Sequence, residues 1–197
     1  MPQKRHHTLQ RKTLETNIVV ELDIDGDGSS QIDTGIGFLN HMLSSLSKHA
    51  GWTLSLTCDG DLHIDDHHTA EDCALALGDC LNQILGSRKG IQRFGHAYVP
   101  LDEALVRAVV DLSGRPWPDI QLQFSRSQIG QLATENIIHF FQSFAISLNA
   151  AIHIDQIKGE NDHHKAEAAF KALARALRDA LQSNGSDIIP STKGSLG

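Results

Sequence analysis

Cysteine is scarce in this 197-residue chain, which contains only Cys58, Cys73 and Cys80 and no CxxC pair. An odd and scattered set argues against a disulfide scaffold and against a thiolate zinc site. The seven-residue spacing of Cys73 and Cys80, two helical turns, predicts that both side chains face a core. We therefore expect reduced thiols, as in a cytosolic protein.

Long apolar runs and an excess of positive charge are also missing. No run reaches the roughly 20 residues that a membrane-spanning helix needs, and the longest candidate, residues 137–154, is broken by polar side chains. Residues 1–12 are polar and basic, unlike a secretory signal, and we expect the pair His6 and His7 to lie in a solvated tail. The formal net charge of −7 argues against a nucleic-acid partner. We predict a soluble, cytoplasmic protein with no membrane or nucleic-acid partner.

Histidine, in contrast, is abundant. The chain has 12 histidines against seven phenylalanines and one tyrosine. Histidine is the commonest metal ligand and the side chain that titrates near neutrality. The rest of the composition, 40% hydrophobic and 21% charged, is that of an ordinary globular protein of one domain or two small ones. The placement of the histidines must therefore decide what their excess means.

Two segments of the chain repeat one another. Residues 66–71 read DHHTAE and residues 162–167 read DHHKAE, an offset of 96. In both copies the following apolar residues recur at three- and four-residue steps, which predicts an amphipathic helix. His41 and His139, 98 residues apart, each open another helical pattern upstream. Two matching copies, each with a matching upstream histidine, indicate an internal duplication.

The remaining patterns predict strands. Residues 16–24, 52–58, 98–112 and 151–157 alternate or are rich in β-branched side chains, and turn sequences follow them. Each half therefore contains strands and two helices, which predicts an α+β fold with helices packed on one face of a mostly antiparallel sheet. We place the half-repeats at residues 1–92 and 93–197 of one compact domain. The Ser- and Gly-rich segment from residue 183 onward should be irregular.

The spacing within each HHxxE motif predicts a metal site. Residues i and i+4 share one face of a helix, and residue i+1 is turned about 100° away. His67 and Glu71 can therefore hold one metal that His68 cannot easily join. The second copy offers the same arrangement.

A symmetric solution completes each pair with the i+1 histidine of the other repeat. The two sets are then His67, Glu71 and His164, and His163, Glu167 and His68. The upstream His41 and His139 are natural fourth ligands, and geometry does not assign them. Three imidazoles and one carboxylate suit an octahedral divalent metal with two positions open for substrate, whereas a closed structural site has no such room.

Other interpretations stay open at this point. A single HHxxE could be a helix surface, with Asp66 and Asp162 capping the two helices; the duplication favours metal. The residue types leave the metal undecided, because imidazole suits zinc or iron and carboxylate suits manganese or magnesium.

The chain resembles the imidazoleglycerol-phosphate dehydratase family nearly from end to end. The motifs that carry the resemblance, in order and at family spacing, are residues 11–16, 34–42, 65–72, 93–95, 111–116, 139–145, 163–171 and 191–194. The resemblance implies a duplicated half-domain of the ribosomal protein S5 domain 2-like fold. It also implies a homo-oligomer of 24 subunits with two manganese(II) ions per active site at subunit interfaces.

The resemblance assigns the ligands to two metals. One set is His41, His68, His163 and Glu167, and the other is His67, Glu71, His139 and His164. It also implies the reaction, the dehydration of imidazole glycerol phosphate to imidazole acetol phosphate in histidine biosynthesis. The hydrogen that is lost has no adjacent carbonyl to acidify it. Two metals at the ring nitrogens would generate an imidazolate that expels the neighbouring hydroxyl.

Further roles rest on the same resemblance. Glu15 matches the catalytic acid/base, although its pattern alone indicates an exposed strand carboxylate. The residues that match phosphate-binding positions are Arg93, Arg115, Lys171, Ser191 and Lys193. His49 and Asp72 fall in stretches near substrate or ligands. Asn40 stands where the family usually has an aspartate that could support His41.

Two other function classes compete with a dehydratase. A metal-storage protein would explain the histidines but not Glu15, Arg93, Arg115 and Lys193. A dinuclear metallohydrolase would normally use carboxylates that bridge two close metals, whereas each site here has a single glutamate. His63, His96 and His153 are expected to be surface or sheet histidines.

Overall fold

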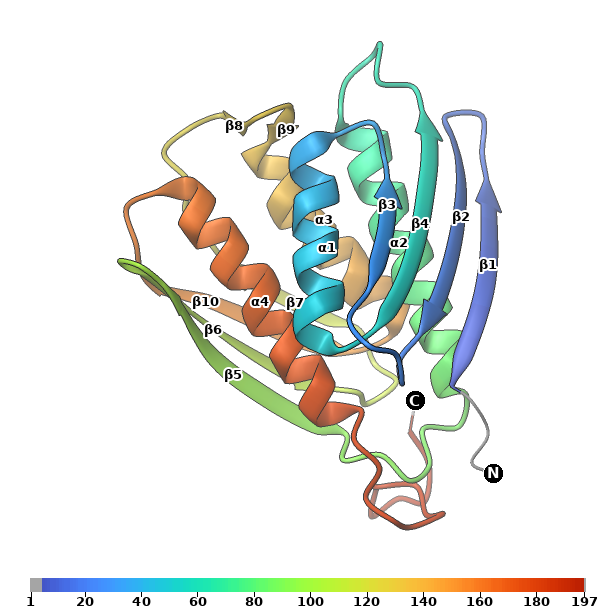
Figure 1. Cartoon of the computed structure of the whole chain (residues 1–197). Helices are drawn as coiled ribbons and strands as arrows, with labels where there is room; N and C mark the ends of the chain where they lie inside the picture. Colours follow the sequence, from blue (N-terminus) through green and yellow to red (C-terminus); the bar gives the residue numbers. More distant parts are fainter. Residues whose placement is uncertain (1–4, 197) are drawn as a thin grey trace.

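Four helices form a layer between two four-stranded sheets in the computed structural model, which describes residues 5–196 (Figure 1). The first sheet has the order β1-β2-β4-β3, with bounds His6–Lys12, Thr16–Asp23, Thr53–Gly60 and Ser30–Asp33. The second has the order β5-β6-β10-β7, with bounds Phe94–Leu101, Ala104–Asp111, Ala151–Lys158 and Trp117–Gln121. Both sheets follow the same order and have only their last pair parallel. The predicted duplicated α+β fold is confirmed.

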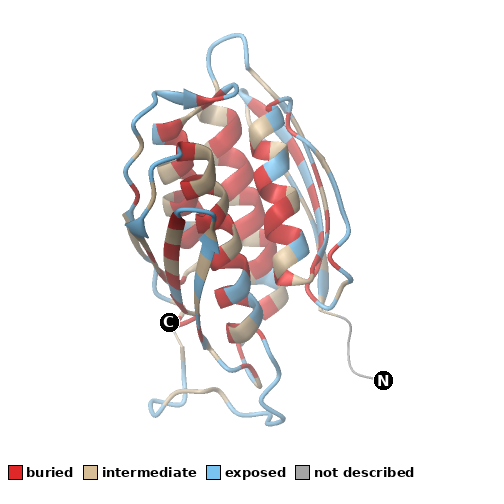
Figure 2. Ribbon diagram, turned by 60° about the vertical axis from the view of Figure 1, so that its left-hand side comes forward, coloured by how far each residue is buried: buried red, intermediate tan, exposed pale blue. Residues whose placement is uncertain are grey.

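The helices repeat the same correspondence. Their bounds are α1 Gly37–Ala50, α2 His67–Leu85, α3 Thr134–Leu148 and α4 Asp162–Ala180. α2 packs on α3 and α1 packs on α4, while the sheets cover the outside of this layer. Alternation along β2 buries Ile18, Val20 and Leu22 against the helices. Figure 2 shows buried residues along the helices of the layer. The buried faces of helices and sheets thus form one continuous core.

Helices α2 and α3 approach one another closely at Gly78. A Cβ atom there would lie 2.8 Å from the carbonyl oxygen of Phe144 and 3.1 Å from the amide nitrogen of Leu148. These are backbone atoms, which cannot move aside as a flexible side chain can. The absence of a side chain at Gly78 is therefore what permits this spacing.

Two expectations about the strands were wrong. Residues 98–112 belong to two strands, because β5 and β6 pair antiparallel around a tight turn at Asp102 and Glu103. His6 and His7 lie in β1 and not in a tail, since β1 pairs with β2 along its whole length. β1 is an edge strand with only partial burial, so a polar sequence can form it.

Other expectations are confirmed. Cys73 and Cys80 are fully buried, and all three cysteines are free thiols. Residues 183–196 contain turns and bends but no helix or extended strand. Within residues 5–196, no helix combines the length and apolar character needed to cross a membrane. The two sheets occupy residues 6–60 and 94–158; the exact boundary at residue 92 stays a prediction, and residues 1–4 and 197 of the predicted halves lie outside the described range.

Candidate active site

The first cluster joins α2 to α3. His67 and Glu71 lie one turn apart on α2, with 3.6 Å between Nε2 and Oε2. His139 reaches the same carboxylate from α3, with 3.3 Å between Nε2 and Oε1, and its ring stacks on that of His67 at 4.9 Å between centroids. One potential ligand atom from each residue falls within 4.8 Å of the others.

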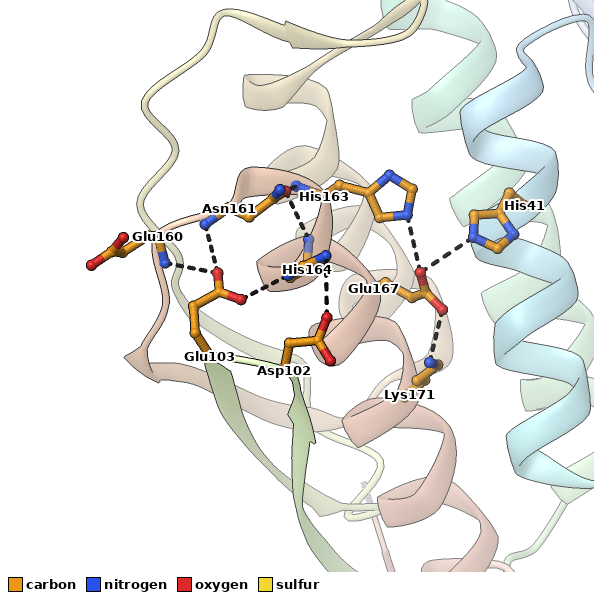
Figure 3. A network of polar contacts seen from close by, with 9 residues as sticks. All are labelled: His41, Asp102, Glu103, Glu160, Asn161, His163, His164, Glu167 and Lys171. Atoms are coloured by element: carbon orange, nitrogen blue, oxygen red, sulfur yellow. Dashed lines mark hydrogen bonds and ion pairs between the residues drawn. The ribbon is translucent and has the colours of Figure 1, made fainter.

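The second cluster joins α1 to α4 (Figure 3). Nε2 of His163 and Nε2 of His41 lie 3.0 and 3.3 Å from the same oxygen of Glu167. The other carboxylate oxygen contacts Nζ of Lys171 at 2.7 Å. Burial alone would raise the pKa of Glu167, but the contacts with Lys171, His163 and His41 together lower that pKa to about 2. Glu167 is therefore a carboxylate at any physiological pH.

The donor atoms of the first cluster suit a divalent cation. Nδ1 of His67 lies 3.1 Å from the side-chain oxygen of Asn136. Since that oxygen can only accept, Nδ1 carries the proton and Nε2 keeps a free lone pair facing Glu71. Nε2 of His139 is buried and has no hydrogen-bond partner within residues 5–196. A buried, unsatisfied imidazole nitrogen beside a carboxylate is costly without a bound cation, so the residues fit a metal.

The i+1 histidines do not join the clusters of their own chain. His68 places Nδ1 3.0 Å from Asp61 and Nε2 3.5 Å from Glu15. His164 places Nδ1 2.7 Å from Glu103 and Nε2 3.8 Å from Asp102. The hydrogen bonds that the two histidines donate to Asp61 and Glu103 raise the pKa values of their imidazoles. The structure thus brings together three of the four residues in each expected ligand set.

The candidate phosphate residues fall in two places. Arg93, Arg115, Ser191 and Lys193 line one cavity of about 470 Å³. The Arg93 guanidinium is held there by Asp111 at 2.7 Å and by the carbonyl of Pro190. These cations make the cavity suited to an anion.

Lys171 does not line that cavity and lies instead in the second metal cluster. His49 is half-buried nearby, where burial and the charges of Lys171 and Arg175 lower its pKa. A neutral imidazole at this place can accept as well as donate a hydrogen bond.

Three residues considered above as a ligand support or as helix caps make other contacts in the structure. Asn40 accepts hydrogen bonds from the backbone and side chain of Thr34, at 2.9 and 2.6 Å, so it holds the start of α1 and not His41. Asp66 does not cap α2; it accepts the amide of Ala133 at the start of α3. Asp162 does not cap α4 either, because Asn161 does so, and Asp162 forms a buried ion pair with Lys165.

Asp72 is also a structural group. Its carboxylate accepts from Arg11 at 2.8 Å and from the hydroxyl of Thr16 at 2.5 Å. These bonds connect α2 to the β1–β2 hairpin that carries Glu15.

Several residues around the clusters were not predicted from the sequence. Asn136 lies three residues before His139, so the helical repeat could have placed it on the same face. Asp61, Asp102 and Glu103 lie in turns outside the repeated motif. No periodicity identifies them, because only the fold brings these turns to the histidines.

Comparisons with known proteins identify the family of the chain. The model of the family described as imidazoleglycerol-phosphate dehydratase matches residues 34–177. The chain is 52% identical to the imidazoleglycerol-phosphate dehydratase of Candida glabrata, over 95% of this chain and 98% of that protein. The chain belongs to the imidazoleglycerol-phosphate dehydratase family. As a member, it is a hydro-lyase of histidine biosynthesis (EC 4.2.1.19).

Other members of the dehydratase family show how far the likeness extends. The chain is 51% identical to the enzyme of Chlorobium phaeovibrioides, over 98% of this chain and 96% of that one. The crystal structure of the Pyrococcus furiosus family member superposes with a TM-score of 0.83 at 37% identity, over 95% of this chain and all of that one. The Staphylococcus aureus structure gives 0.82 at 37% identity, over 91% and 99%. The fold and the family are therefore shared along nearly the whole chain.

Proposed function

We propose that this dehydratase acts through two manganese(II) ions per active site, held by ligands from different subunits. The ligand sets are His41, His68, His163 and Glu167 for one ion, and His67, Glu71, His139 and His164 for the other. One observation carries the proposal. Each single-chain cluster contains two imidazoles and one carboxylate, and the second histidine of each HHxxE motif contacts other carboxylates instead of its own cluster.

The position of His68 and His164 outside the clusters of their own chain supports a site shared between copies. A ligand that cannot reach the cluster of its own chain can complete the cluster of a neighbour. Each ion would then have three imidazoles, one carboxylate and two open positions for substrate. We propose an assembly of 24 such subunits, each built from half-repeats 1–92 and 93–197. We also propose that the protein is cytoplasmic, because its three free thiols suit a reducing environment.

The metal ligands and Glu15 would have different roles in the dehydration of imidazole glycerol phosphate. When bound, the two cations would withdraw charge from the imidazole ring and so acidify it. Glu15, exposed in the β1–β2 turn and 3.5 Å from His68, would move the proton that leaves the carbon chain. Loss of that proton and of the neighbouring hydroxyl gives water and an enol, which becomes the ketone of imidazole acetol phosphate.

Binding of the phosphate would orient the substrate for this step. The cavity lined by Arg93, Arg115, Ser191 and Lys193 supplies two guanidinium groups, a hydroxyl and an ammonium group. Lys171 would add a further cation beside the second cluster, and His49 would contact the substrate as a neutral imidazole.

One assay tests the proposal. Purified protein with manganese(II) and imidazole glycerol phosphate should form imidazole acetol phosphate, and removal of metal by chelation should abolish this turnover. Release of inorganic phosphate would support a metallohydrolase instead. Metal binding without turnover would support a storage protein.

A further inference from the structure

A carboxylate contacts Nδ1 of the outward histidine in each half. In the first half Asp61 contacts His68 at 3.0 Å. In the second half Glu103 contacts His164 at 2.7 Å, as Figure 3 shows. A carboxylate accepts hydrogen bonds and does not donate them when ionised, so both imidazoles carry a proton on Nδ1. In the neutral tautomer, Nε2 of each ring then keeps its lone pair.

The two carboxylates come from places that the duplication does not relate. Asp61 directly follows β4, the fourth strand of its half, whereas Glu103 lies in the turn between the first two strands of the other half. The position that corresponds to Asp61 is near Gly159, after β10. Descent from one ancestral half therefore does not account for both contacts, and the same contact has been built twice by different residues.

Glu103 is itself held firmly. Its other oxygen accepts the backbone amides of Glu160 and Asn161, at 3.2 and 2.7 Å. The side chain of Asn161 in turn accepts the amides of His163 and His164 as the cap of α4. The carboxylate is thus fixed to the same turn that begins the ligand-bearing helix, and it cannot drift from His164 without disturbing that turn.

Asp61 is fixed in a comparable way. Its backbone amide donates to the carbonyl oxygen of Glu15 at 3.1 Å, which joins it to the β1–β2 turn. Its second carboxylate oxygen is buried without a hydrogen-bond partner within residues 5–196. The side-chain hydrogen bond of the Asp61 carboxylate is therefore the one with His68.

We propose that Asp61 and Glu103 are positioning residues that set the tautomer and direction of His68 and His164, so that each presents Nε2 to a metal held by another copy of the chain. The inference rests on the proposed metal centres. Metal-ligating histidines commonly donate their second N–H to a carboxylate, and loss of such a partner weakens metal binding 10- to 100-fold. Each carboxylate should therefore control one of the two metals.

The test begins with the tautomers in metal-free full-length protein. Solid-state ¹⁵N NMR of histidine-labelled chain, assigned with His68→Gln and His164→Gln, should show both rings protonated at Nδ1. In Glu103→Ala the His164 signals should change to a mixture of tautomers while those of His68 stay, and Asp61→Ala should give the reverse. Unchanged tautomers in both variants would overturn the inference, whatever metal the protein binds.

Manganese(II) titration, followed by the electron paramagnetic resonance of free ion, supplies the second readout. Asp61→Ala and Glu103→Ala should each weaken one of two sites per chain about 10- to 100-fold. Glu103→Gln, whose amide oxygen still accepts from Nδ1, should restore most of the affinity. Glu160→Gln is the matched control. It removes a nearby negative charge, but the side chain of Glu160 does not contact His164.

The outcomes separate this inference from the proposed function. Wild-type protein that binds no manganese(II) would contradict the proposed metal centres. The tautomer measurement would still test whether Asp61 and Glu103 set the tautomers of His68 and His164. Two intact, full-affinity sites in Glu103→Ala would overturn the positioning role and leave the proposed function in place.

Discussion

The two metal clusters have the same three donors but different neighbours. Three residues before the upstream histidine, the first cluster has Asn136, which contacts His67, and the second has Phe38, whose ring packs edge-on against His163 at 5.1 Å. Four residues after the glutamate, the first cluster has Leu75 and the second has Lys171. The duplication retained the donor atoms and let their surroundings diverge, so the two sites should respond differently to mutation and pH.

Loss of a donor carboxylate should have the largest effect. Glu71→Gln should reduce bound metal from two ions per chain to one and lower kcat/KM by more than ~100-fold. Loss of even a hydrogen-bond partner of a metal ligand lowers metal affinity or activity roughly 10- to 100-fold, and Glu71 is itself a ligand. Shared ligands should also make assembly incomplete. Elemental analysis with native mass measures both. A normal assembly with two ions per chain would contradict the assignment, and Glu167→Gln should affect the other ion.

The neighbours three residues upstream should differ in their effect on metal affinity. Asn136→Leu removes the acceptor that fixes the ring of His67, so affinity at the first site should fall about 10- to 100-fold. Phe38→Leu removes only an aromatic contact worth ~0.5–1.5 kcal/mol and should change the second site by less than about tenfold. Calorimetric titration of metal into each variant checks the ranking. Equal losses of affinity would mean that the difference between Asn136 and Phe38 does not affect metal binding.

The phosphate cavity should be separable from both clusters. Arg115→Ala removes a charged donor, worth about 1.5 kcal/mol or more, and should raise KM about tenfold while two metals per chain remain. Steady-state kinetics with metal analysis measures this. Arg107→Ala serves as the control, because its guanidinium pairs with Asp155 at 2.9 Å and does not line the cavity. An unchanged KM in Arg115→Ala would remove Arg115 from the site.

Replacement of Lys171, which has no counterpart in the first cluster, should give the smallest effect. This effect is a change in unfolding free energy that depends on pH in the acid range. Glu167 has a folded-state pKa of about 2, below its ordinary 4.5, so its stabilisation is complete above pH 4.5 and is lost as pH falls toward 2. Lys171→Met should cost about 1 kcal/mol of unfolding free energy at neutral pH, and this difference should shrink below pH 4.5. Urea unfolding of metal-free protein over a pH series measures it. Lys158→Met is the surface control, and a difference that grows in acid would contradict the assigned pKa.

The sequence was informative where function follows from helical spacing. His67 with Glu71 and His163 with Glu167 share a helix face because they lie four residues apart, and the repeated motif made this visible twice. The upstream His41 and His139 were found by analogy between the halves, and the structure places each beside the glutamate of a different helix.

Elsewhere the sequence was insufficient for physical reasons. The β5–β6 turn at Asp102 was missed because Asp102 adopts a positive φ of 46° without a glycine to mark it. β1 was missed because an edge strand does not need apolar alternation. Asp61 and Glu103 reach the histidines through turns, and contacts between turns and helices depend on the completed fold.

The close contact at Gly78 has a consequence for coordination chemistry. α2 carries His67 and Glu71, and α3 carries His139, so the two helices are the arms of one chelate. The close backbone approach at Gly78, seven residues or about 10 Å along α2 from Glu71, limits the spacing of the helices and with it the bite of such a chelate. A methyl group there would widen the bite without altering a donor atom. The coordination geometry of a metal held by the first cluster would therefore depend on a residue that has no side chain.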